Sequence, residues 1–183
     1  MLKRAFSVCA IAACVVGFSS LPVLAQGAAG SMGGMEVAKP PAAPSTSLTL
    51  TVDGKATIFS VAELKAIPQK TVQVHNEHSK ADETYSGVPL GDLLAKAGFV
   101  ADKTTQRKML RSYLRAEGSD KYWVIYSLTE VEASEHEGDV IVATSLDGKP
   151  LGVDGELKLV STADKKPERW VRNLVAIVLK SAE

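Results

Sequence analysis

The sequence contains very little cysteine and has no excess of charge of one sign. Two cysteines, Cys9 and Cys14, occur in 183 residues, and both fall near the N-terminus. Without that segment the chain has no thiol, which excludes a disulfide, a thiolate metal ligand and a cysteine nucleophile. The 21 lysines and arginines are balanced by 21 acidic residues, so charge alone does not attract nucleic acid or an anionic membrane. We therefore expect no nucleic-acid partner.

The sequence also lacks an apolar run long enough to span a membrane. An apolar run from Ala5 to Phe18 follows a basic pair, and a small residue, Ala25, comes shortly after it. A spanning helix requires about 20 apolar residues, whereas this shorter pattern is typical of a secretory signal peptide. We predict a signal peptide over residues 1–25, and a periplasmic or secreted protein with no integral membrane segment after cleavage. Lipidation at Cys14 is the alternative.

A change in composition separates the next segment from the rest of the chain. Residues 26–47 are rich in glycine, alanine and proline and show no repeated apolar spacing. Such a segment has no apolar face to bury, which predicts a flexible linker. Periodic apolar spacing begins at Leu48, and residues 48–183 are long enough for one domain of ordinary size.

Short segments of alternating apolar and polar residues dominate this domain. About seven short strands outnumber three short helices, and the strands have irregular spacing. This arrangement favours an α+β fold over a doubly wound parallel sheet. The predicted strands are 48–52 with its hairpin partner 56–59, 71–75, 109–117, 122–126, 140–144 and 157–160, and a final apolar run covers 174–179. The predicted helices are 61–67, 90–97 and a short one that begins after Ser127.

Several short motifs, in the same order along the chain, are similar to those of one known family. They are the strand, turn and capped helix of 48–67, Ser86-Gly87-Val88-Pro89-Leu90-Gly91-Asp92-Leu93-Leu94, Asp120-Lys121-Tyr122 with Ser127-Leu128-Thr129-Glu130, Asp147-Gly148-Lys149-Pro150-Leu151, Gly155-Glu156-Leu157-Lys158-Leu159-Val160, and Lys166-Pro167-Glu168-Arg169-Trp170-Val171-Arg172. Together they resemble the sulfite-oxidase-type molybdopterin-binding domain. The resemblance extends over about residues 48–180, and it implies a mixed, mostly-β fold of that type with a few short helices.

The resemblance also implies a cofactor, but one expected ligand is missing. Redox members of this family hold molybdenum through the dithiolene of molybdopterin and one cysteine thiolate, in the loop after the strand that corresponds to 71–75. Here that loop, 76–83, contains no cysteine. A soft thiolate has no equivalent among oxygen or imidazole ligands. Molybdopterin is thus the cofactor that the resemblance implies, whereas the missing cysteine predicts that none is bound.

Four candidate binding residues lie near the C-terminus. Arg169, Arg172 and Lys166 offer cationic donors to a phosphate, and Trp170 offers a flat wall for a pterin. The resemblance implies that this segment lies near the cofactor pocket. Two alternatives stay open: Trp170 packs in the core, and the arginines pair with neighbouring acids.

Two histidines are further candidates. His75 and His78 stand three residues apart, with carboxylates nearby, but two imidazoles without a third ligand at fixed spacing are a weak metal signal. We therefore assign no metal site and keep both histidines as candidate cofactor-binding residues. The alternative is that His75 is a half-exposed strand residue and His78 a solvated loop residue. No catalytic residue is assigned.

Two functions remain open. In the first, the protein is an exported molybdopterin-dependent-oxidoreductase-like domain without the usual molybdenum–cysteine redox site. In the second, the same fold has become a cofactor-free periplasmic module that binds a small ligand or an unknown protein. The second predicts a pocket that is more apolar or collapsed. Fold alone does not decide between them.

Overall fold

The computed structural model describes residues 43–132 and 135–182. The predicted signal peptide and nearly all of the predicted linker lie outside the described residues. Within the described part of the chain, no helix is long and apolar enough to cross a membrane. The described elements are mostly strands with a few short helices, which confirms the predicted α+β class.

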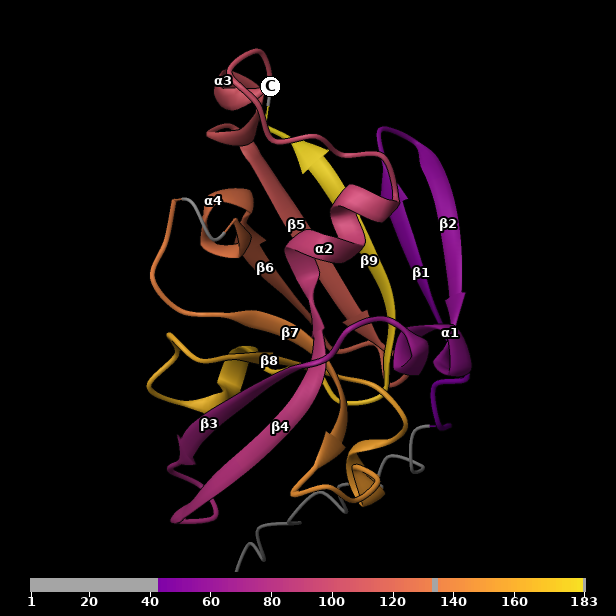
Figure 1. The fold of residues 1–183 in the computed structure, drawn as a ribbon, viewed down its shortest axis with the longest axis vertical. Helices are drawn as coiled ribbons and strands as arrows, with labels where there is room; N and C mark the ends of the chain where they lie inside the picture. The colour runs from indigo at the N-terminus through magenta and orange to yellow at the C-terminus, as the bar shows by residue number, and fades with distance from the viewer. Residues whose placement is uncertain (1–42, 133–134, 183) are drawn as a thin grey trace, which may run out of the picture. The chain divides into compact units, whose positions relative to one another are not determined.

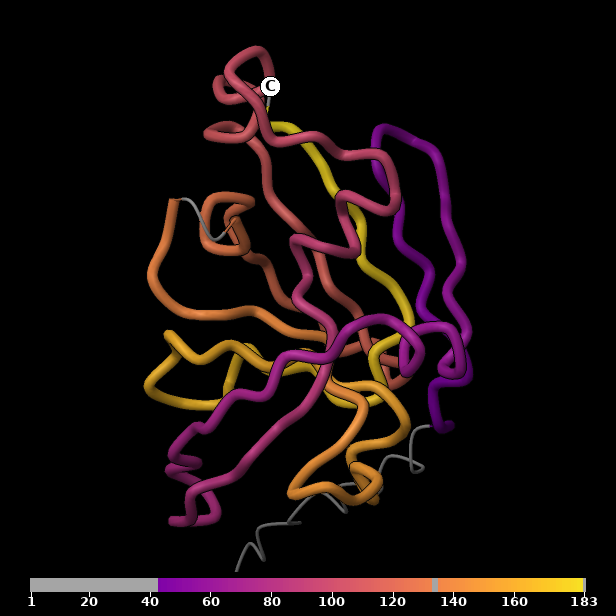
Figure 2. The backbone as a smooth tube through the Cα atoms, viewed as in Figure 1, coloured from indigo at the N-terminus to yellow at the C-terminus, as the bar shows by residue number. Residues whose placement is uncertain are grey.

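The first of two sheets has five strands. It consists, in spatial order, of β2 (Lys55–Ser60), β1 (Ser47–Val52), β9 (Leu174–Ser181), β5 (Ser112–Gly118) and β6 (Trp123–Ser127). β1 and β9 pair in parallel and the other neighbours are antiparallel. The first and last strands therefore run side by side in Figure 2, indigo beside yellow. Burial alternates along β1 and β5, as expected for a sheet with one face on the core.

The second sheet has four strands, all antiparallel. Its spatial order is β3 (Lys70–Asn76), β4 (Ala81–Pro89), β7 (Val140–Leu146) and β8 (Lys158–Ser161). β3 and β4 form a long twisted hairpin, and Figure 1 shows its tip reaching beyond β7 and β8. This hairpin supplies part of the candidate site described below.

Short helices connect the strands. They are α1 (Val61–Ala66), α2 (Leu90–Lys96), α3 (Gln106–Met109), α4 (Leu128–Val131) and the 3₁₀ helices η1 (Gly152–Asp154) and η2 (Pro167–Arg169). Capping boxes begin two of these helices, at Ser60 with Glu63 and at Ser127 with Glu130. Each box satisfies backbone N–H groups that a helix start leaves without partners.

In the four-stranded sheet, β7 and β8 are buried on both faces, whereas alternate residues of β3 are exposed. On the central strand β7, Val142 packs in the main core, which both sheets and the helices share, whereas Ile141 belongs to a second cluster on the opposite face. That second cluster also contains Tyr85 of β4 and Trp170, which follows η2. The second face therefore lies beneath aromatic residues that reach the candidate site.

Two sequence predictions about local structure are wrong. The segment 76–83 is not a loop, because Asn76 ends β3, residues 77–80 form a tight turn and β4 begins at Ala81. The polar side chains of this segment make hydrogen bonds within the hairpin instead of alternating with apolar ones. The apolar pattern therefore gave no sign of the start of β4. The strand expected from 109 begins instead at Ser112, because Met109 ends the short helix α3 and packs in the core.

Candidate functional site

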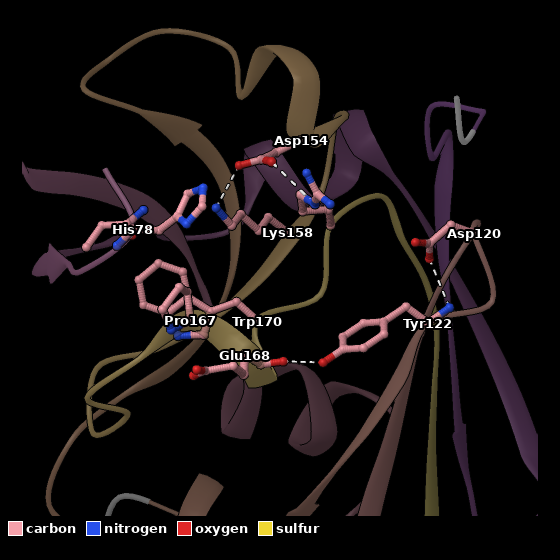
Figure 3. A pocket seen from close by; sticks show the side chains of 10 residues that line it. His78, Asp120, Tyr122, Asp154, Lys158, Pro167, Glu168 and Trp170 are labelled. Atoms are coloured by element: carbon pink, nitrogen blue, oxygen red, sulfur yellow. Dashed lines mark hydrogen bonds and ion pairs between the residues drawn. The ribbon is translucent and has the colours of Figure 1, made fainter. Parts of the chain in front are cut away.

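A pocket of about 390 Å³ opens on the second face of the four-stranded sheet. Figure 3 shows it from close by, with Lys158 and His78 on one side and Tyr122 and Asp120 on the other. Five separate segments build it, so no single stretch of sequence contains it. Its lining residues are Asn76, His78, Asp120, Tyr122, Asp154, Lys158, Pro167, Glu168, Trp170 and Arg172.

Lys158 is the most unusual residue of the pocket, because its side chain is a buried cation. It projects from β8, and its residue surface is only 6% exposed. Its ammonium group donates to Asp154 Oδ2 at 2.6 Å and to the hydroxyl oxygen of Tyr85 at 2.8 Å. It also lies 4.9 Å and 5.2 Å from the ring centres of Tyr85 and Trp170. A buried charge is tolerated only when it is paired in this way.

A tight backbone turn holds the carboxylate that faces Lys158. Asp154 ends η1, and its backbone oxygen accepts a hydrogen bond from the Asn173 N–H at 2.8 Å. Gly155 follows with φ of +90°, and a Cβ there would lie 1.9 Å from Asn173 Oδ1. Glycine is therefore required at this close approach. On its other side, Asp154 Oδ1 lies 3.8 Å from Arg172 Nε, so the carboxylate sits between two cations.

A second carboxylate lies under the pocket without lining it. Glu83 of β4 accepts hydrogen bonds from the Tyr85 hydroxyl at 2.7 Å, from Asn76 Nδ2 at 2.9 and 3.0 Å, and from Ser79 Oγ at 2.9 Å. Partial burial raises the pKa of Glu83, but these hydrogen bonds and the charge of Lys158 outweigh it and leave the pKa below its ordinary value. Burial, together with the hydrogen bond to Glu83, raises the pKa of Tyr85 far above the usual range.

Aromatic side chains form the walls. Trp170 is buried, donates from Nε1 to the Ser161 carbonyl at 3.1 Å and meets the ring of Tyr85 edge to face at 5.8 Å. Tyr122 is 45% exposed, and its hydroxyl donates to the Glu168 carbonyl. These contacts orient both rings while leaving Tyr122 open to a ligand.

The structure brings three of the six predicted site residues to this pocket. Trp170, Arg172 and His78 line it. Lys166 lies in an adjoining hollow of about 400 Å³, which shares His78, Pro167 and Glu168 with the pocket.

The other two predicted residues do not line the pocket. The Arg169 guanidinium pairs with Asp164 and with Glu130 at 3.0 Å, and it covers the ring of Tyr126. Hydrogen bonds to Asp164 and Glu130 hold its pKa above the ordinary value despite burial. His75 is half-exposed on β3 and pairs with Asp82 at 2.8 Å. Both contacts match the alternative that the sequence left open for these residues, in which they serve structural roles.

Sequence reasoning missed the buried part of the site. Lys158, Asp154, Tyr85 and Glu83 were not singled out as binding residues. One signal was present: Lys158 interrupts the apolar run Leu157–Val160, and a lysine inside a buried strand needs a specific partner. That partner, Tyr85, lies 73 positions away, so only the fold reveals the network.

Comparison with known proteins identifies the family. The sequence pattern described as "Oxidoreductase molybdopterin binding domain" matches residues 37–155, more than half of the chain. The chain belongs to this family. This molybdopterin-binding domain has no match among curated proteins.

A solved structure shares the fold. The sulfane dehydrogenase SoxCD from Paracoccus pantotrophus is 20% identical in sequence and superposes with a TM-score of 0.57. The match covers 75% of this chain and 39% of the SoxCD chain, so the molybdopterin-binding domain spans about two fifths of that protein. At this identity the likeness shows a common sulfite-oxidase-like fold and leaves the function to the site itself.

The donor groups of the pocket do not fit molybdenum held by a protein thiolate. None of the described residues is a cysteine, and they contain no group of three or more histidine, cysteine, aspartate or glutamate side chains that could hold a metal ion. The floor of the pocket carries the Lys158 cation, which repels a metal ion. The organic part of molybdopterin fits better, because the pocket offers aromatic walls, carboxylate acceptors and the cationic donors Lys158 and Arg172.

Proposed function

We propose that the protein is an exported molybdopterin-binding domain that takes the organic, pterin part of a molybdopterin-type ligand without a protein thiolate on molybdenum. One observation carries the proposal: the pocket floor is the buried ammonium of Lys158, enclosed by two aromatic rings and a carboxylate. Such a floor favours a flat, electron-rich ligand over a metal cation.

The other lining residues have complementary roles in this proposal. Trp170 and Tyr122 supply flat surfaces for a ring, while Asp120 and Glu168 offer carboxylates to the N–H groups of an aminopyrimidinone. Arg172 offers a guanidinium to an anionic tail, and Lys166 extends the cationic rim into the adjoining hollow. A small-molecule ligand is therefore the expected partner.

Export to the periplasm is part of the same proposal. The signal-peptide pattern over residues 1–25 supports it, and the scarcity of cysteine outside that segment agrees with a protein that folds without disulfides.

A cofactor-free binding module is the second candidate. It predicts an apolar or collapsed pocket, whereas this pocket keeps about 390 Å³ and several charged residues. Such a module would instead bind its partner on the five-stranded sheet, where Trp123 and Ile125 of β6 are 50% and 46% exposed. The pocket chemistry therefore favours the pterin ligand.

The test is the pterin and molybdenum content of the full chain, purified from a host that makes molybdopterin. We expect pterin, detected by fluorescence after oxidation, without an equal amount of molybdenum by mass spectrometry. Lys158→Met should lose the pterin, and Asp82→Asn, which changes an exposed carboxylate outside the pocket, should keep it. One molybdenum per chain would refute the thiolate-free site, and absence of both would support the cofactor-free module.

A further inference from the structure

The outer face of the five-stranded sheet carries very little charge. Leu48 and Leu50 of β1 point into the main core, so the alternate residues Thr49 and Thr51 point to the opposite, outer face. The strand registers place these two threonines in two rows that cross all five strands. From β2 to β6, the first row is Ile58, Thr49, Ala176, Glu117 and Trp123, and the second row is Ala56, Thr51, Val178, Arg115 and Ile125. Glu117 and Arg115 are the only charged residues of the two rows.

Apolar side chains are exposed at both edges of the outer face. Ile58 lies on β2, whereas Trp123 and Ile125 lie on β6, at the other edge of the sheet (Figure 1), and all three are exposed. The buried residues of α1, α2 and α4 pack in the main core, on the other side of the sheet. A sheet face that meets water normally carries polar residues. A mostly uncharged face with exposed apolar edges therefore indicates a binding surface.

The two rows complement each other in charge and in size. Arg115 and Glu117 stand two positions apart on β5, and their side chains pair at 2.8 Å. On β9 the small Ala176 lies in the first row and the larger Val178 in the second. A twofold axis that crosses the strands between the rows brings the first row of one copy opposite the second row of another. Opposite charges then face each other across the interface, and on β2 and β9 a small residue faces a larger one.

Two further contacts hold the charged pair in place. The Arg115 guanidinium lies 5.0 Å from the centre of the Trp123 ring. The highly exposed Lys121, in the turn between β5 and β6, lies 3.4 Å from Glu117. These contacts fix both charged side chains before a partner binds, which reduces the entropy lost on binding. A patch with excess charge would repel its own copy, whereas an opposite pair beside a twofold axis attracts it.

We propose that the outer face is the interface of a homodimer in which two copies pack their five-stranded sheets face to face. Arg115 of each copy then meets Glu117 of the other, and Trp123 meets Ile125. Such an interface uses the same patch on both copies, and two stacked sheets align their strands within about 30°. None of the residues in the two rows lines the pocket, so the dimer goes beyond the proposed function and does not depend on it.

Sedimentation velocity of the protein produced from the full chain tests the dimer, which we expect at micromolar concentration. Arg115→Glu and Glu117→Arg each set like charges opposite each other twice per dimer. Each variant should therefore raise the dissociation constant about 100-fold or more. The matched controls are Lys65→Glu and Glu156→Arg, which make the same charge changes in an exposed pair outside the two rows. Both controls should remain dimeric.

A mixture of the two charge variants separates contacts between copies from contacts within one copy. Arg115→Glu gives a face with two carboxylates, and Glu117→Arg gives a face with two guanidinium groups. The two variants should form a heterodimer, although neither forms a homodimer. Contacts within one copy cannot produce this recovery, because each variant keeps its own like-charged pair.

A third variant keeps the test valid if a charge variant fails to fold, which circular dichroism detects. Ile125→Glu places a charge against Trp123 of the other copy, at a position that is already exposed, and it should also abolish the dimer. Its control is Leu110→Glu, which changes an exposed apolar residue outside the two rows and should remain dimeric.

Three outcomes would overturn the homodimer. A monomer at every concentration would leave the outer face to a different protein. A dimer that persists in Arg115→Glu, Glu117→Arg and Ile125→Glu would show that the copies meet elsewhere. Loss of the dimer in both charge variants, without recovery in their mixture, would refute the opposed rows.

Discussion

At the scale of single residues, Lys158 and its two hydrogen-bond partners determine the charge at the floor of the pocket. Its two hydrogen-bond partners come from different elements, Tyr85 from β4 and Asp154 from η1. The ammonium therefore ties the hairpin to the turn that precedes β8. A buried cation held this way is costly to disturb, because each partner is left with an unsatisfied polar group.

Replacement of Lys158 by methionine tests how much this buried charge contributes to stability. The change keeps the length of the side chain but removes the charge, which leaves the partly buried Asp154 Oδ2 and the Tyr85 oxygen without their donor. We expect the free energy of unfolding to fall by about 2–4 kcal/mol, measured by urea denaturation. The control is Lys65→Met, since Lys65 is half-exposed and pairs with Glu156 only at 3.5 Å. Equal stability of the two variants would contradict the role given to Lys158.

The raised pKa of Tyr85 predicts a pH dependence at alkaline pH. In the unfolded chain this hydroxyl loses its proton above its ordinary pKa of 10.0, whereas burial and the Glu83 charge keep it protonated in the folded protein. A folded-state pKa above the unfolded value gives stability that is complete below pH 10 and declines as the pH rises further. In urea denaturation at pH 8 to 11, the free energy of unfolding should fall more steeply with pH for the natural protein than for Tyr85→Phe. An equal pH dependence in the two proteins would refute the raised pKa of Tyr85.

At the scale of elements, the bulge between β4 and β7 is the most constrained point of the second sheet. The register between β4 and β7 shifts between Ser86 and Gly87. A Cβ on Gly87 would lie 2.3 Å from the Val142 carbonyl oxygen, inside the sheet. The bulge therefore allows the two strands to approach only if no side chain is present.

Gly87→Ala should consequently be among the most damaging small substitutions. The strands must separate to admit the methyl group, and we expect a loss of about 3 kcal/mol or more, or failure to fold. Gly91→Ala is the matched control, because a Cβ at Gly91 in α2 would meet the Val131 carbonyl oxygen at an ordinary 3.5 Å. The control should be neutral or stabilise by about 0.5–1 kcal/mol. Similar thermal midpoints for both variants would contradict the close approach.

The same elements show how far sequence reasoning reaches. Local patterns predicted the capped helix within 48–67 and the strand over 71–75, both of which the structure confirms, and the half-exposed His75 matches the alternative that they left open. They failed for β4, because Glu83 and its polar neighbours make hydrogen bonds to the adjacent hairpin strand instead of packing in a core. Contacts of this kind join residues far apart in sequence and leave no periodic signal.

At the scale of the whole molecule, the two sheets differ in burial and in their relation to the pocket. The five-stranded sheet has one face on the main core, with exposed Trp123 and Ile125 on the other. In the four-stranded sheet, β7 and β8 are buried on both faces, and the cluster on the second face ends at the pocket. The charged floor is thus supported by strands that are buried on both faces, which suits a site that must hold its donors in fixed directions.

The predicted signal peptide over residues 1–25 determines where the whole chain is found and where its mature form begins. Production of the full chain in a Gram-negative bacterium should yield a periplasmic protein whose intact mass corresponds to residues 26–183, because the predicted cleavage follows Ala25. A lipoprotein would instead begin at Cys14, with added lipid mass, and Cys14→Ser would abolish its membrane retention. If cleavage follows Ala25, that variant should behave as the natural protein does, since both cysteines leave with the signal peptide.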